Sequence, residues 1–205
     1  MASHFEEAMK TAINRKQQIL EFATEAFSRD GYDRVTVKQL ADRCGITEPA
    51  VYRHFPSKDA IYITVLESLR DRIENQELFD RLEKEDDLEK ILTSIAGHII
   101  AFYTENADMY RLLLYAALRG HERAKRIFEL IRGNYVRFLT LQFERLEVAG
   151  MLVHKQHELT ARCFVAMVFD CALSYTLWKG FQGKTYDLQA VVANNVPIYV
   201  RGLKA

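Results

Sequence analysis

The stretch VTVKQLADRCGITEPAVYRHFPSK (residues 35–58) contains several helix-start signals and a helix-stop signal, which leave little freedom in how it folds. Thr36 followed three residues later by Gln39 is a capping box, in which each side chain takes a free backbone amide at a helix start. Gly45 supplies the left-handed conformation that commonly ends a helix. Thr47 is expected to cap a second helix. The stretch therefore predicts two short helices joined by a tight turn.

Two such helices form a helix-turn-helix, whose second helix enters the major groove of DNA. At 100° per residue, Val51 and Phe55 share one face of the second helix and must point inward, which leaves Arg53 pointing outward. Arginine can read guanine edges, whereas Tyr, Thr, His and Lys suit phosphate oxygens. Ser57 is expected to start a third helix, and the free amides there add to anion binding by Lys58. The predicted DNA contacts are Thr36, Lys38, Thr47, Glu48, Pro49, Ala50, Tyr52, Arg53, His54 and Lys58.

The motif residues also follow one another in a specific order. A glycine, a small hydroxyl residue, Tyr-x-His-Phe and Ser-Lys are matched by Gly45, Thr47, residues 52–55 and residues 57–58. With them, the run from residue 19 to residue 61 resembles the N-terminal domain of the tetracycline-repressor (TetR) family. The resemblance implies a dimeric regulator that reads a palindromic operator with two recognition helices. It also implies a C-terminal domain that binds a small ligand.

The composition favours helices. The 205 residues include only 3 prolines and 9 glycines, which favours long uninterrupted helices and few loops. The fold class is therefore predicted to be all-α, with a three-helix helix-turn-helix domain followed by a larger helical domain for ligand binding and dimerisation. We expect these domains at residues 1–56 and 57–205.

The net charge of zero argues against a protein that coats nucleic acid nonspecifically, because such binding needs a broadly basic surface. The basic residues gather locally instead. Residues 34–58 contain five basic side chains, Arg43 among them, against the two acidic side chains of Asp42 and Glu48. This modest excess fits a dimer that reads a specific site.

The cysteines and the N-terminal residues predict a cytoplasmic protein. The sequence contains an odd number of cysteines, and they lack the spacing of a disulfide framework, which suits a reducing compartment. They are Cys44, Cys163 and Cys171. The start MASHFEEAMKTA is polar and has no apolar core, so it resembles neither a signal peptide nor a membrane anchor.

Apolar residues at helical spacing predict a series of further helices. The charged run DRLEKEDD (residues 80–87) is interpreted as a solvated connector. Gly133, in the middle of a long helical pattern, is interpreted as a close helix approach or a kink. The expected helices outside the motif span residues 14–30, 57–78, 88–103, 106–119, 122–149, 159–179 and 187–203.

The last two expected helices are apolar on more than one face. Residues 159–179 are apolar nearly all round, so several faces of that helix must be covered. A membrane span is not expected, because Arg162 and Asp170 interrupt a segment of borderline length. In the final helix Pro197 is expected to cause a kink or a restart, with Asn195 as the new cap. Coverage by a partner subunit is the simplest solution, and it predicts a homodimer through the C-terminal helices.

The TetR resemblance places the candidate effector site in the second domain. Asp170 is a possible polar anchor, although a structural partner such as Arg162 or Arg137 would explain it equally. Aromatic residues at helical spacing are more often core than ligand contacts, so each one is only a candidate. The set favours a flat or long hydrophobic ligand. It consists of Phe102, Tyr103, Met109, Tyr110, Leu113, Phe128, Tyr135, Phe138, Met167, Asp170, Tyr175 and Trp178.

Metal, redox and enzymatic sites have little support in the sequence. His154, His157 and Cys163 could be metal ligands, but no second cluster completes a tetrahedral set, so solvated histidines are favoured. Cys44 is most simply a small buried residue, since a redox sensor would need a low thiol pKa. An all-helical enzyme is a remote alternative, because no nucleophile–base pair, phosphate loop or metal set stands out. We expect no cofactor and no metal.

The sequence thus predicts a ligand-responsive repressor that binds double-stranded operator DNA as a homodimer and is released by a small hydrophobic effector. The alternative is a DNA-binding protein of the same fold that needs no small ligand, or whose ligand acts as a corepressor.

Overall fold

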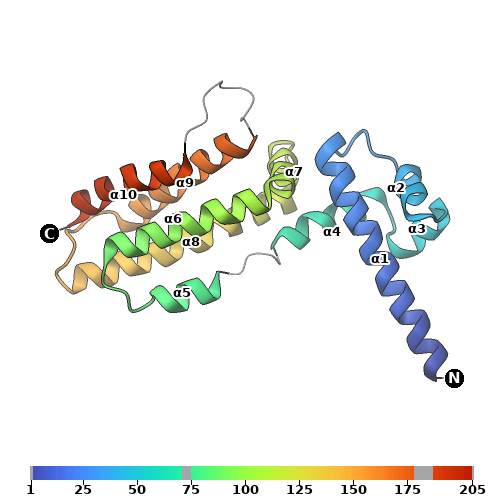
Figure 1. Cartoon of the computed structure of the whole chain (residues 1–205), viewed down its shortest axis with the longest axis horizontal. Helices are drawn as coiled ribbons and strands as arrows, with labels where there is room; N and C mark the ends of the chain where they lie inside the picture. Colours follow the sequence, from blue (N-terminus) through green and yellow to red (C-terminus); the bar gives the residue numbers. More distant parts are fainter. Residues whose placement is uncertain (1, 71–74, 178–186, 205) are drawn as a thin grey trace. The chain divides into compact units, whose positions relative to one another are not determined.

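The computed structural model describes residues 2–70, 75–177 and 187–204. In this part of the chain, all segments of regular secondary structure longer than a single bridge are helices (Figure 1). Apart from the helices, Leu152 and Lys204 form an isolated antiparallel bridge. The predicted all-α class is confirmed. The helices are α1 (Ala2–Asp30), α2 (Val37–Cys44), α3 (Glu48–His54), α4 (Lys58–Arg70), α5 (Gln76–Leu82), α6 (Leu88–Glu105), α7 (Ala107–Leu118), α8 (Glu122–Val148), α9 (His157–Leu177) and α10 (Leu188–Leu203).

The chain forms two compact units. The first unit contains α1 to α4, together with α7 and the first residues of α8 up to residue 127. The second unit contains α5, α6, the remainder of α8, α9 and α10. The domains that the sequence suggested, residues 1–56 and 57–205, stay a prediction.

The first unit is built on α1, which packs against α2 and α4 while α2 packs against α3. The stripe that the sequence places on α1 is inside, since Ile19, Ala23 and Phe27 are almost fully buried. Ile61 of α4 is equally buried. The predicted start of the first helix near residue 14 was wrong, because α1 begins at Ala2. No proline or glycine occurs before residue 31 to stop the helix from extending.

The region after α4 differs from its prediction. A helix was expected to run from residue 57 to residue 78; residues 71–74 lie outside the described residues, and a separate helix α5 follows them. The charged run at residues 80–87 is not all connector, because its first three residues belong to α5 and Leu82 is 1% exposed. Phe79 anchors α5 by stacking on Phe138 of α8, with ring centroids 4.4 Å apart.

In the second unit, α6 packs against both α9 and α10, and α9 packs against α10 (Figure 1). The ring of Phe169 on α9 meets Tyr103 of α6 edge to face, with centroids 4.8 Å apart. The same ring lies 6.0 Å from that of Tyr135 on α8. Aromatic pairs of this geometry stabilise a core beyond the area they bury. Predicted aromatic residues of the effector site therefore contribute to the core.

The C-terminal helix does not restart at its proline. Asp187 caps α10 by accepting a hydrogen bond from the amide of Gln189 at 2.9 Å, and Pro197 lies inside the continuous helix. The expected cap at Asn195 was wrong, because its side-chain amide donates to the carbonyl of Val191 at 2.9 Å. Packing of buried Val196 and Val200 holds the helix together across the proline.

Helix α9 is long and apolar enough to raise the question of a membrane span. By length and composition alone, residues 157–176 could cross a membrane, so Arg162 and Asp170 do not by themselves exclude a span as predicted. One such helix is weak support, since core helices of globular proteins have the same composition. Within the second unit α9 packs against α6 and α10.

Candidate nucleic-acid interface and effector region

The turn between α2 and α3 has the geometry that the sequence predicts. The hydroxyl of Thr36 accepts from the amide of Gln39 at 3.2 Å, and the side chain of Gln39 accepts from the amide of Thr36 at 2.8 Å. Gly45 ends α2 with a φ of 64°, in the left-handed region. The following amide, that of Ile46, donates to the carbonyl of Ala41 at 3.0 Å. These bonds satisfy the end of α2 and set the direction in which α3 begins.

Thr47 departs from its predicted role in part. It occupies the N-cap position of α3 with an extended backbone, at φ −89° and ψ 156°, but its side chain makes no capping hydrogen bond. The side chain is exposed, so the hydroxyl is available to a phosphate oxygen. Pro49 in the first turn lacks an amide that would have needed a cap.

The two faces of α3 are as predicted. Val51 is 0% exposed and Phe55, directly after the helix, is 3% exposed. On the opposite side Arg53 is exposed, and on the flank Tyr52 is 47% exposed. An exposed tyrosine and arginine on a short helix, backed by buried apolar residues, form a rigid outward face suited to a DNA groove. The remaining candidates on α3 are exposed or partly exposed: Glu48, Pro49, Ala50 and His54.

The charges around this face are fewer than the sequence suggests. Arg43 contributes little, because its guanidinium pairs with Glu25 at 2.8 Å and lies 4.8 Å from the ring centroid of Phe22. Lys38 on α2 is exposed. Lys58 begins α4, and its ammonium lies 4.2 Å from the ring centroid of Tyr32.

Lys16 lies near the outward face of α3, although it is not part of the helix-turn-helix motif. It is exposed on α1, and its ammonium lies 5.5 Å from the ring centroid of Phe55, beside the end of α3. Its sequence signal is weak, because it stands three residues before Ile19 at the edge of the α1 stripe and outside the motif. Only the packing of α1 against α2 and of α2 against α3 reveals that it borders the recognition helix.

Cys44 is a structural residue, as predicted. Its side chain is 5% exposed, and burial raises the pKa of its thiol. A raised pKa lowers the thiolate fraction and so opposes redox reactivity.

The predicted effector residues divide between the two units. Tyr110 and Leu113 are buried in the first unit, whereas Phe102, Tyr103, Tyr135 and Phe138 are buried in the second. Tyr135 is hydrogen-bonded to His98 Nδ1 at 2.8 Å, and burial raises its pKa. Asp170 is exposed, so it is not a carboxylate enclosed by apolar side chains as the sequence suggested. Met167 and Tyr175 are partly exposed, while the Met109 side chain and Trp178 lie outside the described residues.

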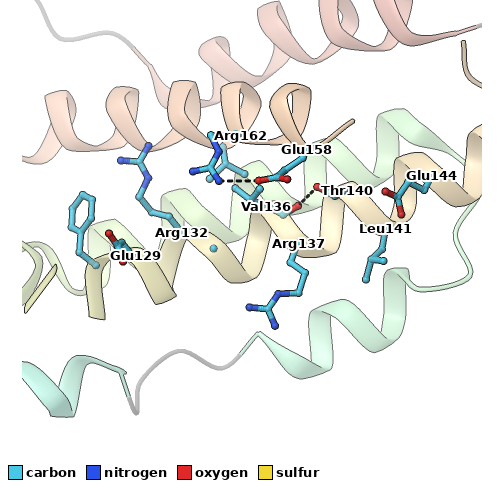
Figure 2. A pocket seen from close by; sticks show the side chains of 12 residues that line it. Glu129, Arg132, Val136, Arg137, Thr140, Leu141, Glu144, Glu158 and Arg162 are labelled. Carbon is cyan, nitrogen blue, oxygen red and sulfur yellow. Dashed lines mark hydrogen bonds and ion pairs between the residues drawn. The ribbon is translucent and has the colours of Figure 1, made fainter. Parts of the chain in front are cut away.

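The described residues form an open groove of about 860 Å³ between α8 and α9 (Figure 2). Of the predicted effector residues whose side chains the structure describes, only Phe128 lines it. Gly133 faces this groove, and a Cβ there would meet nothing within 4 Å, so the predicted close approach at this glycine was wrong. The lining is Phe128, Glu129, Arg132, Gly133, Val136, Arg137, Thr140, Leu141, Glu144, Glu158, Arg162 and Val165.

The charged side chains of the groove form separate ion pairs and cation–π contacts, and they do not converge on one binding position. Arg162 binds Glu158 at 3.0 Å, and Arg132 lies 5.2 Å from the ring centroid of Phe169. Figure 2 shows Arg132 and Arg137 leaving α8 in opposite directions. The groove therefore offers apolar contact and separate charges, not a convergent anion site. A second hollow of about 420 Å³, between α5 and α8, is lined by Phe138 of the predicted set.

The comparisons with known proteins agree with the helix-turn-helix geometry. The family model described as "Bacterial regulatory proteins, tetR family" matches residues 19–65. The nucleoid occlusion factor SlmA of Yersinia enterocolitica is 32% identical over 157 residues, which cover 75% of this chain and 72% of that protein.

The chain belongs to the TetR family. SlmA of Vibrio cholerae is 32% identical over 130 residues, covering 60% of this chain and 65% of that protein, slightly less than two thirds of its length. A solved TetR-family transcriptional regulator from Mesorhizobium loti superposes with a TM-score of 0.70 at 20% identity, and the match covers 95% of this chain and 98% of that one. The latter likeness concerns the fold alone.

As a TetR-family protein, the chain is a DNA-binding transcriptional regulator with its helix-turn-helix at α2 and α3. The similarity to SlmA covers more residues than the family model matches, so it extends beyond the DNA-binding motif. The family and these relatives give the enzyme alternative no support.

The two histidines near the start of α9 are not both solvated as predicted. His157 is 7% exposed, and its Nε2 donates to one carboxylate oxygen of Glu147 on α8. His154 Nδ1 lies 2.8 Å from the other oxygen of the same carboxylate. Both hydrogen bonds lower the pKa of Glu147, and the bond from His157 has the larger effect. The described residues contain no group of three side chains placed to hold a metal ion.

Proposed function

We propose that this TetR-family regulator binds a palindromic operator as a homodimer and represses transcription until a small hydrophobic effector releases it. The observation that carries the DNA-binding part is the outward face of α3, with Tyr52 and Arg53 exposed over buried Val51 and Phe55. Tyrosine and arginine are suited to phosphate and guanine contacts respectively.

A dimer follows from the size of the recognition helix. Helix α3 has 7 residues, so it is only about 10 Å long and covers few base pairs. A two-fold dimer presents two such helices to half-sites about 34 Å apart, which is one turn of DNA. The operator is therefore expected to be palindromic.

The surface of α9 and α10 supports pairing of these helices with a second copy. Leu159 on α9 is 54% exposed, and Ile198 on α10 is 53% exposed. Met167 and Leu173 of α9 are also partly exposed. Burying such side chains against the same surface of a second subunit removes apolar area from water, at about 25 cal/mol per Å².

The effector part of the proposal rests on the α8–α9 groove. Phe128, Val136 and Val165 give it apolar walls, and Arg137 is exposed at its edge. A ligand with a hydrophobic body would bury these walls. Because the last helices also form the proposed dimer surface, a ligand that favours one arrangement of the dimer needs a coupling free energy of only about 1 to 3 kcal/mol to change operator occupancy.

The experiment is an equilibrium binding titration on a duplex from the region upstream of the gene, with wild type, Arg53→Ala and Arg81→Ala. Loss of a base-reading arginine should weaken binding by about 1 to 3 kcal/mol, roughly fivefold to 160-fold. Arg81 is exposed on α5, outside the proposed interface, and serves as the matched control. Equal affinities for all three proteins would contradict the assignment of α3.

Adding hydrophobic extracts to the same titration tests the effector. Release of the DNA indicates an inducer, and tighter binding indicates a corepressor. No change in affinity indicates a regulator that needs no ligand.

A second candidate is a nucleoid occlusion factor that acts without a small effector. The similarity that covers 75% of this chain at 32% identity to a protein named for that function favours it. Mapping of the protein on the chromosome after crosslinking distinguishes the two candidates. A repressor should occupy one or a few promoters, whereas a factor acting on the nucleoid should occupy many sites that are unrelated to promoters.

A further inference from the structure

The ammonium of Lys58 has a defined place before any DNA is bound. Lys58 is the first residue of α4, and its side chain is only partly exposed. Its Nζ lies 4.2 Å from the ring centroid of Tyr32, within the range of a cation–π interaction. A lysine side chain has a flexible four-carbon stem, so an exposed lysine without such a contact would sample many positions.

The ring of Tyr32 is itself held on several sides. Its hydroxyl donates to Asp59 Oδ1 at 3.1 Å. Its centroid lies 4.6 Å from that of Tyr62 and 5.8 Å from that of Phe27. Burial, followed by the neighbouring charge of Asp59, raises the pKa of the Tyr32 hydroxyl, which therefore stays a donor at neutral pH. The ring is a fixed platform.

The platform is also supported by the turn between α7 and α8, which belongs to the same unit. Tyr62 lies edge-on to the ring of His121, with centroids 6.3 Å apart. Asp33, next to Tyr32 in the chain, forms an ion pair with Arg119. Tyr32 is thus fixed directly from α1 and α4, while this turn supports its neighbours Tyr62 and Asp33.

We propose that Tyr32 is a positioning residue for DNA binding, which holds the ammonium of Lys58 at the N-terminal end of α4 ready to meet a phosphate. The inference rests on the proposed DNA-binding role of Lys58. An ammonium has three donors, and the ring occupies one side of it only. Lys58 can therefore contact a phosphate oxygen without leaving Tyr32. The hydroxyl of Ser57 already accepts from the amide of Ala60 at 3.0 Å, and the positive end of the α4 dipole favours an anion at the same place.

The test is a double-mutant cycle read through the salt dependence of binding. One duplex of fixed sequence, isolated from a random library by selection on the wild type, is titrated with wild type, Lys58→Met, Tyr32→Leu, Tyr32→Phe and the double variant Tyr32→Leu/Lys58→Met. Lys84→Met, at an exposed lysine before α6, is the matched control. Each lost phosphate contact should reduce the slope of log K against log salt by about 0.9.

We expect Lys58→Met to weaken binding and to reduce the slope, while Lys84→Met does neither. Tyr32→Leu should weaken binding severalfold with a smaller slope, and it should have no further effect once Lys58 is replaced. Tyr32→Phe keeps the ring and should retain most of the affinity. The proposal is overturned if Tyr32→Leu weakens binding by the same factor in the Lys58→Met background, because the tyrosine would then act only on the fold. It is also overturned if Lys58→Met leaves the slope unchanged.

A second measurement needs no change at Tyr32, in case that variant does not fold. In protein with labelled lysine, the side-chain methylene signals of Lys58, assigned by their loss in Lys58→Met, should be shifted upfield by the ring of Tyr32. They should stay shifted when the duplex is added. A return to ordinary lysine positions on DNA binding would show that Lys58 leaves the ring and would refute the proposal. If the wild type selects no duplex at all, the proposed function itself fails, a result distinct from any of these.

Discussion

The guanidinium of Arg15 donates to the carbonyl oxygen of Cys44 over 3.0 Å and so ties α1 to the last residue of α2. A cation at this end of a helix also interacts favourably with the negative end of the helix dipole. Because α3 follows after a short turn, the contact helps to set the angle at which the recognition helix leaves the first unit.

Replacing Arg15 by Met keeps the apolar stem and removes this charged hydrogen bond. We expect the free energy of unfolding in urea to fall by about 1 to 2 kcal/mol, since the contact is partly buried. Gln17→Met is the control, because Gln17 is exposed on the same helix and its bond to Glu21 is a surface contact. That change should stay within about 0.5 kcal/mol. An unfolding midpoint for Arg15→Met equal to that of wild type would rule out the role given to Arg15.

Gly45→Ala should destabilise the helix-turn-helix. Gly45 has a φ of 64°, and a residue with a Cβ costs roughly 1 to 2 kcal/mol in that conformation. Gly97→Ala in α6 is the matched control, because a Cβ there would meet nothing within 4 Å. In a helix interior that change should stabilise by about 0.5 to 1 kcal/mol. The two variants should thus shift the thermal midpoint in opposite directions, and shifts of the same sign would contradict the assignment.

Glu147→Gln should lower stability in a pH-dependent manner. The hydrogen bonds from His157 and His154 lower the pKa of Glu147 below its ordinary 4.5. A carboxylate with a lowered folded-state pKa contributes stability above its unfolded pKa and loses that contribution as pH falls through the folded value. Wild type should therefore be more stable than Glu147→Gln at neutral pH, and the difference should shrink below pH 4.5.

Glu144→Gln is the control for that experiment, since Glu144 is exposed on the same helix. Urea unfolding of all three proteins across the acidic range measures the effect. A gap between wild type and Glu147→Gln that is constant with pH would mean that the two histidines do not depend on the charge of Glu147.

Ile198→Glu should disrupt the proposed dimer. Ile198 is 53% exposed on α10, so the substitution creates no buried charge in a single subunit. In a two-fold interface it would place two carboxylates among apolar side chains, which is strongly unfavourable. Sedimentation should report a monomer, and operator affinity should fall together with dimerisation. Val148→Glu, at a residue of α8 that is 90% exposed, should remain dimeric. A dimeric Ile198→Glu would exclude this part of α10 from the interface.

The local parts of the structure follow from neighbouring residues. Thr36 and Gln39 are three positions apart, so their capping box depends on one turn of chain. The burial of Val51 and Phe55 opposite Arg53 follows from the helical period alone. The bounds of α6, α7 and α8 agree with the expected helices to within two residues, because glycines at 120 and 150 end two of them.

Three of the corrections involve contacts between residues on different helices. The sequence suggests that Arg43 is a free positive charge, but its guanidinium forms an ion pair with Glu25 on α1 at 2.8 Å. The run at residues 80–87 looked like solvent-exposed linker, but α5 is fixed through Phe79 on the distant Phe138. His157 looked solvated, yet it is buried against Glu147 of the preceding helix.

The helical class, the position of the helix-turn-helix and the outward face of α3 follow from the sequence, because helix caps, turn glycines and the 3.6-residue period act over a few positions. The packing of the helices, by contrast, establishes which charged side chains are paired, which aromatic rings belong to the core, and that Tyr32 lies under the ammonium of Lys58. These outcomes depend on which surfaces of separate helices pack together, and no local pattern in the chain encodes that choice.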